Sequence, residues 1–339
     1  MTGGTGDRAV LVERPGAARL VTRPRPEPGP GEVLVRVAAA GICLSDREVY
    51  EGRRPPGYVR YPVVPGHEWS GTVEAVGPGV DPELTGRPCV AEGFRSCGTC
   101  ERCRYGETSL CTAGYAETGF TEPGAFADRL LVPVRLLHLL PDGSDLRAAA
   151  LLEPAAVVAA AVRAGRPRPG ERIAVVGAGT LGLLAVRWLA AHSPAELAVV
   201  DPRAARAGRA LDFGASAALA PGEAAHGAFD LVVETAGAPT TAASSCLLAR
   251  RGGRVVLTGM FAEGAAGIDP VHLSVSQLEL RSVFGASSAA WTDAVRAFST
   301  GLLDPAPLVT HEFPLERFAE ALDLVGCGDP AVGKVLLRP

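Results

Sequence analysis

The sequence predicts an α/β protein in which a β-rich domain is interrupted by a second domain built on a doubly wound parallel sheet. Short apolar runs separated by Pro and Gly fill residues 8–95, as expected for β structure. Between residues 172 and 259, apolar runs alternate with helical patterns, which is typical of a parallel sheet covered by helices. This alternation stops near residue 287, and the chain ends on a strand-like run at 333–337.

The domain boundaries follow from these changes of pattern. At 339 residues the chain is long enough for two domains, each with its own core. We expect the β-rich domain over residues 1–155 and the parallel-sheet domain over residues 156–288, with residues 289–339 returning to the first domain. The parallel-sheet domain would thus be inserted within the other domain.

Composition excludes several classes of partner. Hydrophobic residues make up 47% and charged residues 21%, as in an ordinary globular protein. A formal net charge of -4 without blocks of like charge provides no basic surface for nucleic acid. No apolar run has the length of a membrane span, and the first residues lack the apolar core of a signal peptide. We therefore expect a cytoplasmic protein with no membrane partner.

The elements of the β-rich part are expected in the following order. Strands are predicted at 9–12, 32–37, 69–76, 125–133 and 137–141, then a helix at 146–164, and after the inserted domain a helix at 289–298, a strand at 308–313 and a helix at 315–325. Pro154 lies inside the helical pattern at 146–164, so a boundary or kink near Glu153 is expected.

Two short segments of the β-rich part carry metal-binding residue types. Cys43, Ser45 and Asp46 follow one strand, and His67 and Glu68 open the next. A thiolate, an imidazole and a carboxylate converging from adjacent turns would suit zinc. The alternative is that each is a packed or hydrogen-bonded residue without a metal, which is the usual role of a single Cys or His.

Four cysteines are clustered in a lobe at residues 95–113. Cys97, Cys100, Cys103 and Cys111 lie within fifteen residues, and the first three are spaced by steps of three. Four thiolates form a closed tetrahedral cage with no position for substrate, which predicts a structural zinc. Two disulfides or free thiols are the alternative, and a reducing compartment disfavours the disulfides.

Glu153 is an acid in an apolar neighbourhood, residues 151–158. Buried acids are normally paired or bound to metal, so Glu153 is a candidate ligand. It is equally placed to cap a helix whose first residue is Pro154, and both roles are compatible.

A glycine-rich turn opens the parallel-sheet domain. Gly177, Gly179 and Gly182 follow an apolar strand with G-x-G-x-x-G spacing, and a helix follows them. These glycines allow the tight turn, the approach of a pyrophosphate and close helix packing, while the helix N-terminus, with Thr180 and Leu181, binds the phosphates. A parallel-sheet turn without ligand is the alternative.

The second strand of this domain, at 196–201, ends on Asp201, which lies 19 residues past Gly182. A carboxylate at this position accepts hydrogen bonds from the adenosine ribose and repels a 2′-phosphate, so NAD is favoured over NADP. Arg203 and Arg206 bear on this choice, since either would accommodate a 2′-phosphate, although adenine stacking or a surface role is the expected one.

The remaining elements of this domain complete the alternation. They are a helix at 204–213, strands at 217–219 and 229–237, a helix at 241–250 and a strand at 254–259. Ligands lie at the carboxyl ends of parallel strands. Thr235, Ala236, Gly259 and Met260 are therefore predicted neighbours of the nicotinamide.

In their order and spacing, these motifs resemble those of the zinc-dependent medium-chain alcohol dehydrogenases. The pair Glu153-Pro154 is similar to the pair found at this position in the sorbitol and threonine dehydrogenase branch of that family. The resemblance implies a GroES-like catalytic domain wrapping a Rossmann domain, with the active site in the cleft. It also implies a homodimer or homotetramer.

When the roles of the family's residues are carried over to the matching positions, the resemblance implies that Cys43, His67 and Glu153 are ligands or near-ligands of a catalytic zinc. Glu68 would be a carboxylate that exchanges at the metal. Ser45 would begin the proton relay, and Asp46 would orient His67. These roles, with the structural site, imply two zinc ions per chain.

Three positions depart from the family pattern and leave the relay beyond Ser45 open. They are Leu44, Arg47 and Glu48. Glu48, Tyr50 or solvent would continue the relay, while Arg47 would face either a polar substrate group or, more simply, the surface.

The function expected from all of this is hydride transfer between a secondary alcohol and NAD, with a polyol, cyclitol or amino alcohol as substrate. The alternatives are an NADP-linked aldehyde, ketone or alkene reductase of the same superfamily, and a scaffold that binds NAD without turnover.

Overall fold

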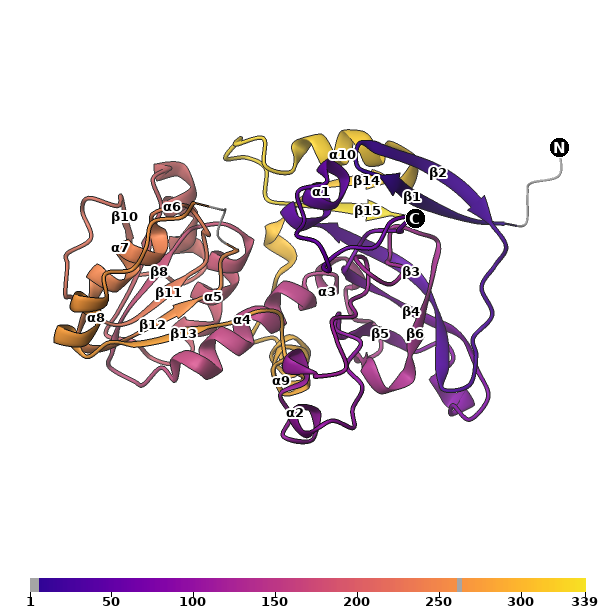
Figure 1. Cartoon of the computed structure of the whole chain (residues 1–339), viewed down its shortest axis with the longest axis horizontal. Helices are drawn as coiled ribbons and strands as arrows, with labels where there is room; N and C mark the ends of the chain where they lie inside the picture. Colours follow the sequence, from indigo (N-terminus) through magenta and orange to yellow (C-terminus); the bar gives the residue numbers. More distant parts are fainter. Residues whose placement is uncertain (1–5, 261–263) are drawn as a thin grey trace. The chain divides into compact units, whose positions relative to one another are not determined.

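The computed structural model describes residues 6–260 and 264–339, which form two compact units (Figure 1). The first unit comprises Met1–Glu153 and Ser287–Pro339, and the second comprises Pro154–Ala286. The sequence placed these transitions after residues 155 and 288. The chain therefore leaves the first unit once, builds the second from one continuous segment, and returns.

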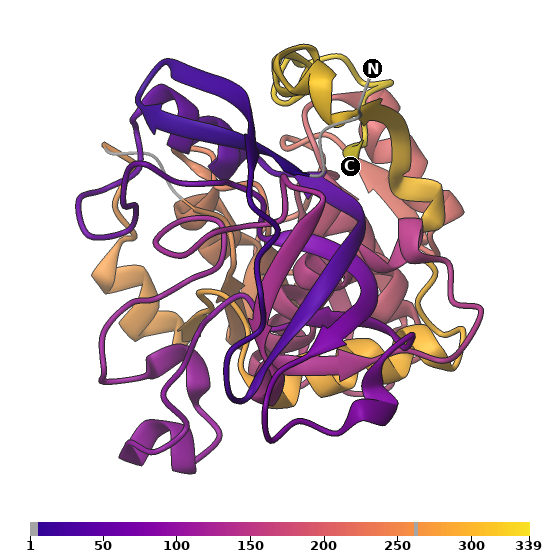
Figure 2. The ribbon, with the colours of Figure 1, turned by 90° about the vertical axis from the view of Figure 1, so that its right-hand side faces the viewer.

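The first unit is organised by a seven-stranded sheet with the order β14-β15-β3-β4-β5-β7, in which β6 also pairs with β3. Its strands are β3 (Glu32–Ile42), β4 (Glu68–Val76), β5 (Pro88–Ala91), β6 (Arg129–Pro133), β7 (Leu137–Leu139), β14 (Val309–Pro314) and β15 (Lys334–Arg338). A separate two-stranded sheet joins β1 (Asp7–Arg14) to β2 (Ala17–Arg23), drawn in indigo in Figure 2. Most residues of β3 are buried, and only Arg36 is exposed, because this strand pairs with β4, β6 and β15 inside the sheet.

The second unit contains a six-stranded parallel sheet with the order β10-β9-β8-β11-β12-β13. Its strands are β8 (Arg172–Val176), β9 (Glu196–Val200), β10 (Ala217–Leu219), β11 (Phe229–Glu234), β12 (Ala249–Leu257) and β13 (Glu279–Ser282). Four consecutive residues of β8 and of β9 are buried. This is the reason that these strands appear in the sequence as continuous apolar runs rather than alternating ones.

The helices of the second unit flank this sheet in Figure 1. They are α4 (Leu152–Gly165), α5 (Thr180–Ala190), α6 (Ala204–Asp212), α7 (Thr241–Leu248) and α8 (Pro270–Ser276). The first unit contains α1 (Leu44–Glu51), α2 (Glu101–Arg104), α3 (Leu146–Ala149), α9 (Ser288–Ser299) and α10 (Phe318–Leu324). Among the residues that the structure describes, no helix combines the length and the apolar character needed to cross a bilayer.

The helix predicted over 146–164 is divided into α3 and α4, with the break at residues 150 and 151. Pro154 is the third residue of α4, where its missing N–H has no intrahelical partner to lose. The break therefore precedes Glu153, and the proline occupies the first turn of a new helix.

Six of the helices and strands in the described residues were not predicted: β2, α1, β5, α2, α8 and β13. Each is short, so it has too few residues for a period of 2 or 3.6 to appear. The expected helix at 241–250 ends at Leu248 because its last residues already belong to β12. In the helix expected at 315–325, the first three residues form a separate 3-10 turn before α10.

Candidate active site

The first candidate metal centre forms where β3 ends and β4 begins. These strands pair antiparallel with Gly41 opposite Glu68, so Cys43 comes next to His67. One ligand atom each from Cys43, His67 and Glu68 lies within 4.8 Å of the others. A side chain at Gly41 would lie 2.4 Å from a Glu68 carboxylate oxygen, so glycine makes room for that carboxylate. Sulfur, nitrogen and oxygen donors at this spacing fit zinc.

Asp46 holds the two donor segments together. It is 1% exposed, and its carboxylate accepts hydrogen bonds from the backbone N–H groups of Cys43 (2.8 Å) and Gly66 (3.2 Å). Its Oδ1 also lies 3.3 Å from His67 Nδ1, within ion-pair range but not aligned as a hydrogen bond. Burial alone would lower the pKa of His67, but Asp46 and Cys43 together outweigh it and raise that pKa well above its ordinary value. Asp46 therefore faces Nδ1 of His67.

Ser45 lies in the first turn of α1, with its Oγ 3.5 Å from His67 Nε2. The hydroxyl is thus beside the ring nitrogen that Asp46 does not face. The proposed continuations of the relay are engaged elsewhere: Tyr50 donates to the carbonyl of Gly16 at 3.4 Å, and Glu48 lies 3.9 Å from Arg54.

Arg47 is held away from a ligand role by its own contacts. Its guanidinium pairs with Glu51 at 2.7 Å and donates to the carbonyl of Val325 at 2.7 Å. These contacts agree with the simpler expectation, in which Arg47 has a structural role at the surface of α1 rather than a substrate to bind.

Lys334 is a site residue that the sequence analysis did not identify. Its Nζ lies 2.7 and 2.6 Å from the two oxygens of Glu68 and donates to the carbonyl of Ile42 at 3.3 Å. The side chains of Lys334 and Glu68 are only 5% and 2% exposed. Burial would lower the pKa of Lys334, but the Glu68 charge raises it. The signal available in the sequence is that this is the only lysine in the chain.

Glu153 lies in the first turn of α4. It does not belong to the group of donors formed by Cys43, His67 and Glu68 within 4.8 Å of one another. Burial raises its pKa to about 8, with Glu68 and Glu117 adding to the effect and His67 and Lys334 opposing it. Glu153 is thus an acid whose ionisation depends on the charges of this centre. Its role as a metal ligand stays a prediction.

A second group of side chains beside His67 was also not predicted from the sequence. The ring of Phe120 lies 4.7 Å from the His67 ring, and the Arg54 guanidinium lies 3.7 Å from the centre of the Phe120 ring. Arg54 donates to Tyr115 at 3.1 Å, and Tyr115 donates to Glu117. Burial raises the pKa of Glu117, against the opposing charges of His67 and Arg54. No sequence motif connects these residues.

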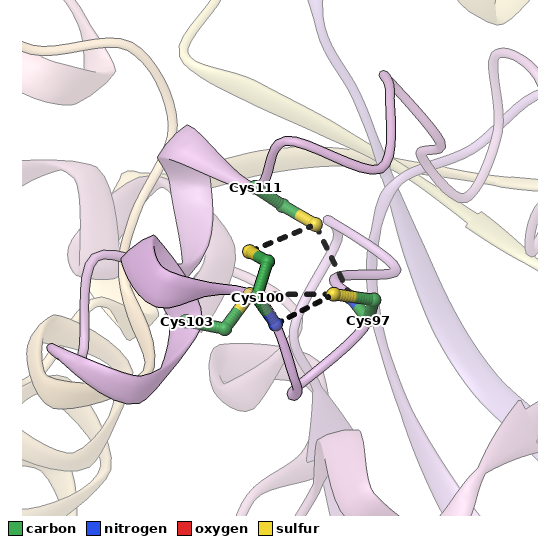
Figure 3. A group of neighbouring side chains, drawn as sticks. All are labelled: Cys97, Cys100, Cys103 and Cys111. Carbon is green, nitrogen blue, oxygen red and sulfur yellow. Dashed lines mark hydrogen bonds between the residues drawn. The ribbon is translucent and has the colours of Figure 1, made fainter.

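The four clustered cysteines form the second candidate metal centre (Figure 3). Sγ atoms of Cys97 and Cys103 are 4.0 Å apart, as are those of Cys100 and Cys111, and none is disulfide-bonded. The edge of a tetrahedron with Zn–S bonds of about 2.3 Å is roughly 3.8 Å, so the spacing fits a four-thiolate zinc site. A disulfide needs sulfurs about 2 Å apart.

Backbone N–H groups donate hydrogen bonds to sulfur atoms of this cluster and so favour the thiolate form, which binds a cation. Cys97 Sγ accepts hydrogen bonds from the N–H groups of Thr99 (3.4 Å) and Cys100 (3.3 Å). The Thr99 hydroxyl, which donates to Cys97 Sγ at 3.5 Å, and these N–H groups lower the pKa of Cys97 to about 7, while backbone hydrogen bonds lower that of Cys100 to about 5. Burial raises the pKa of Cys103 to about 12, so loading this centre would displace a proton from that thiol.

The glycine-rich turn of the second unit is tightly packed between β8 and α5. Gly177 has a φ of +102°, and a Cβ on Gly182 would lie 1.9 Å from the carbonyl oxygen of Gly177. Both positions therefore require glycine. Gly179 is the N-cap of α5, and a Cβ there would meet nothing within 4 Å. Thr180 and Leu181 begin α5, so their N–H groups are among those without intrahelical partners.

Asp201 follows β9 and is 3% exposed. Its carboxylate accepts hydrogen bonds from the N–H of Ala178 (3.0 Å) and from the N–H (2.9 Å) and Nε (3.2 Å) of Arg203. Burial would raise the pKa of Asp201, but these bonds lower it. The acid is therefore tied to the turn that precedes α5. Arg206 lies in the first turn of α6.

Residues after β11 and β12 meet at the carboxyl edge of the sheet. A Cβ on Gly259 would lie 2.3 Å from the N–H nitrogen of Gly237, whose own Cβ would lie 2.5 Å from the carbonyl oxygen of Met260. Thr235 donates to the carbonyl of Val176 at 2.9 Å, while Ala236 and Met260 are exposed. The predicted nicotinamide neighbours are therefore adjacent to one another.

Glu234, at the end of β11, supports this edge and was not predicted. It is 0% exposed, and its Oε1 accepts hydrogen bonds from Ala236 N–H (2.8 Å), Gly237 N–H (2.8 Å) and Thr241 Oγ1 (2.7 Å). The available signal was an acid closing an apolar strand.

Two protein-family models match the chain. The alcohol dehydrogenase GroES-like domain matches residues 29–142, and the zinc-binding dehydrogenase domain matches residues 180–300. The chain is 31% identical to L-threonine 3-dehydrogenase of Bacillus subtilis, over 99% of both proteins. It is 30% identical to sorbitol dehydrogenase of Homo sapiens, over 93% of this chain and 91% of the relative.

Solved structures have the same fold. The structure of a "short chain alcohol dehydrogenase (rspB)" of E. coli CFT073, complexed with NADH, superposes with a TM-score of 0.91 at 28% identity, covering 99% of this chain and 100% of the other. A putative zinc-binding dehydrogenase of Sinorhizobium meliloti 1021, bound to NADP, gives the same TM-score, identity and coverage.

Proposed function

Because the chain belongs to the zinc-binding alcohol dehydrogenase family, we propose that it transfers hydride between a secondary alcohol and NAD, with a polyol, cyclitol or amino alcohol as substrate. The observation that carries this proposal is the meeting of Cys43, His67 and Glu68 within 4.8 Å, with the Ser45 hydroxyl beside His67. A scaffold that only bound NAD would have no use for such a donor set.

Cys43, His67 and either Glu68 or Glu153 would hold the catalytic ion. A zinc ion bound there supplies Lewis acidity, which lowers the pKa of an alcohol hydroxyl. Ser45 Oγ, 3.5 Å from His67 Nε2, is placed to receive the alcohol proton and pass it to solvent. Asp46 orients His67 through Nδ1, and Lys334 holds the Glu68 carboxylate.

Cys97, Cys100, Cys103 and Cys111 would hold a second, structural zinc. Their four sulfurs form a closed set, so this ion would order the lobe at residues 95–113 without contacting substrate. The proposal therefore requires two zinc ions per chain.

NAD is the proposed hydride acceptor. Gly177, Gly179 and Gly182, with Thr180 and Leu181, would receive the pyrophosphate, and Asp201 the adenosine ribose. Thr235, Ala236, Gly259 and Met260 would adjoin the nicotinamide. A carboxylate at Asp201 favours NAD, although Arg203 bonded to it, or Arg206 on α6, would receive a 2′-phosphate if the preference were NADP.

The test is a screen for NAD and NADP reduction over linear polyols, cyclitols and amino alcohols, with zinc measured on the same protein. We expect two zinc ions per chain and turnover with NAD. One zinc per chain with reduction of activated alkenes would favour the reductase alternative. Full loading with two zinc ions and tight NADH binding, but no turnover of any alcohol or ketone, would contradict the proposal.

A homodimer or homotetramer and a cytoplasmic location stay predictions from the resemblance and from the sequence. Size-exclusion chromatography with light scattering tests the first. Fractionation of the producing cells tests the second.

A further inference from the structure

The group beside His67 contains an arginine whose charge is buried without a full set of partners. The Arg54 side chain is 8% exposed and lies against Phe120, with its guanidinium carbon 3.7 Å from the ring centre. Its Nε donates to the carbonyl of Tyr58 at 3.2 Å, and its Nη2 donates to Tyr115 at 3.1 Å. Within residues 6–260 and 264–339, its Nη1 donates no hydrogen bond, and it lies 3.9 Å from Oε2 of Glu48.

A buried carboxylate lies close to Arg54. The Glu117 side chain is 8% exposed, and its Oε2 accepts the Tyr115 hydroxyl and lies 3.7 Å from Arg54 Nη2. In the described part of the chain, its Oε1 accepts no hydrogen bond. A side chain at residue 93 would begin 3.5 Å from Oε1, and Gly93 leaves that space open. Arg54 and Glu117 therefore offer one free donor and one free acceptor.

This pair is close to the proposed catalytic metal. Phe120 is 1% exposed and contacts both groups: its ring centre lies 3.7 Å from the Arg54 guanidinium carbon and 4.7 Å from the centre of the His67 ring. Arg54 and the candidate metal ligand His67 therefore share one aromatic neighbour. If the reacting hydroxyl of a substrate lies beside His67, other groups of that substrate, a few carbons from the reacting hydroxyl, would reach Arg54 and Glu117.

We propose that Arg54 and Glu117 are the specificity residues of this site and that they bind a second, neutral hydroxyl of the substrate, remote from the carbon that is oxidised. A hydroxyl both accepts and donates, so it satisfies Nη1 of Arg54 and Oε1 of Glu117 together. This inference rests on the proposed function and selects polyols and cyclitols among its substrate classes.

Charge excludes the other polar groups. Two carboxylates, of Glu48 and Glu117, already lie within 4 Å of the guanidinium, so a substrate carboxylate or phosphate would add a third negative charge. An ammonium group can only donate, so it would leave Nη1 unpaired and face a like charge. Amino alcohols are therefore poorer substrates than neutral polyols of the same length.

The test compares substrates that share a carbon skeleton. Sorbitol and hexan-2-ol form a linear pair, myo-inositol and cyclohexanol form a cyclic pair, and glucamine is the amine counterpart of sorbitol. Each is assayed with the wild type, Arg54→Met and Glu117→Gln. Met keeps an unbranched chain on Phe120 but removes every donor.

We expect Arg54→Met to lower kcat/KM for the preferred polyol by about 10- to 100-fold, because a buried hydrogen bond to a charged group is lost. The loss should appear in KM with kcat nearly unchanged, since the remote hydroxyl is bound equally before and during hydride transfer. The matching monoalcohol should change by less than about threefold. Arg54→Lys keeps the charge and should recover part of the loss.

Arg53→Met is the matched control, because Arg53 is the neighbouring arginine, is 55% exposed and pairs with Glu51. It should leave all KM values unchanged. Zinc content and Tm of every variant separate folding from recognition. If Arg54→Met weakens polyol and monoalcohol equally, Arg54 has only a structural role and the inference is wrong. A wild-type preference for glucamine, or for the monoalcohols, would also overturn it.

A binding measurement separates this inference from the proposed function. Calorimetric titration of the zinc-loaded protein with polyol and monoalcohol needs no turnover. Tighter polyol binding that Arg54→Met abolishes, in a protein that transfers no hydride, would support the specificity site and refute the proposed reaction. Turnover of alcohols without any polyol preference would do the reverse.

Discussion

Replacement of Lys334 by Met tests whether the buried ion pair between Lys334 and Glu68 stabilises the first candidate metal centre. The substitution removes an ammonium group that lies 2.7 and 2.6 Å from the two oxygens of a carboxylate only 2% exposed. Removing one partner of a buried pair leaves an uncompensated charge and costs about 3–5 kcal/mol. At about 2–4 °C per kcal/mol, the Tm of the first unit should fall by roughly 6–20 °C in metal-free protein.

Zinc should reverse part of this loss. Without Lys334, Glu68 has the metal as its remaining cation, so added zinc should raise the Tm of Lys334→Met more than that of the wild type. The double variant Lys334→Met, Glu68→Gln removes both charges and should be more stable than Lys334→Met alone. Both comparisons use thermal unfolding of chelator-treated protein with and without added zinc.

Arg338→Met is the control on the same strand, because Arg338 and its partner Glu312 are 45% and 35% exposed and 3.5 Å apart. It should cost less than about 1 kcal/mol. A loss no greater than this control for Lys334→Met, or a double variant less stable than Lys334→Met, would refute the reasoning that Glu68 depends on Lys334.

Three further outcomes are expected. Gly182→Ala should destabilise the second unit by about 1–3 kcal/mol in urea unfolding, because its Cβ would lie 1.9 Å from the Gly177 carbonyl oxygen. Gly179→Ala has open space around its Cβ, so it should keep the stability of the wild type and lose NADH affinity in a fluorescence titration. Equal stability losses in the two variants would contradict this reasoning. Cys97→Ser should reduce zinc from two to one per chain by elemental analysis, and a protein that keeps two would remove Cys97 from the cage. Asp201→Asn should be less stable than the wild type at pH 7, because the pKa of Asp201 is lowered in the folded protein. The carboxylate stabilises the fold fully above its unfolded pKa of about 4, and this stabilisation is lost as pH falls through the folded pKa. A stability difference between variant and wild type that grows on acidification would contradict the lowered pKa of Asp201.

The sequence by itself determined the α/β fold class and the residue types that meet in both candidate metal centres. The four cysteines lie within fifteen residues, and the glycine turn within six, so their spacing is short-range information that a single segment carries. The strands β8 and β9 were equally readable, because burial on both faces makes them continuous apolar runs. The short elements α1 and β13 were missed because they have too few residues to show a period.

Only the tertiary structure decided what surrounds those donors. Lys334 and Glu68 are 266 residues apart, and they meet because β15 pairs with β3 in the register that places Val335 opposite Ile42. Arg54 and Tyr115, 61 residues apart, meet beside His67 through loops whose path no local pattern records. Strand pairing and loop packing are set by contacts between distant segments. For this reason, the chemistry of the centre is visible in the sequence, while its electrostatic environment and the proposed specificity site are visible only in the fold.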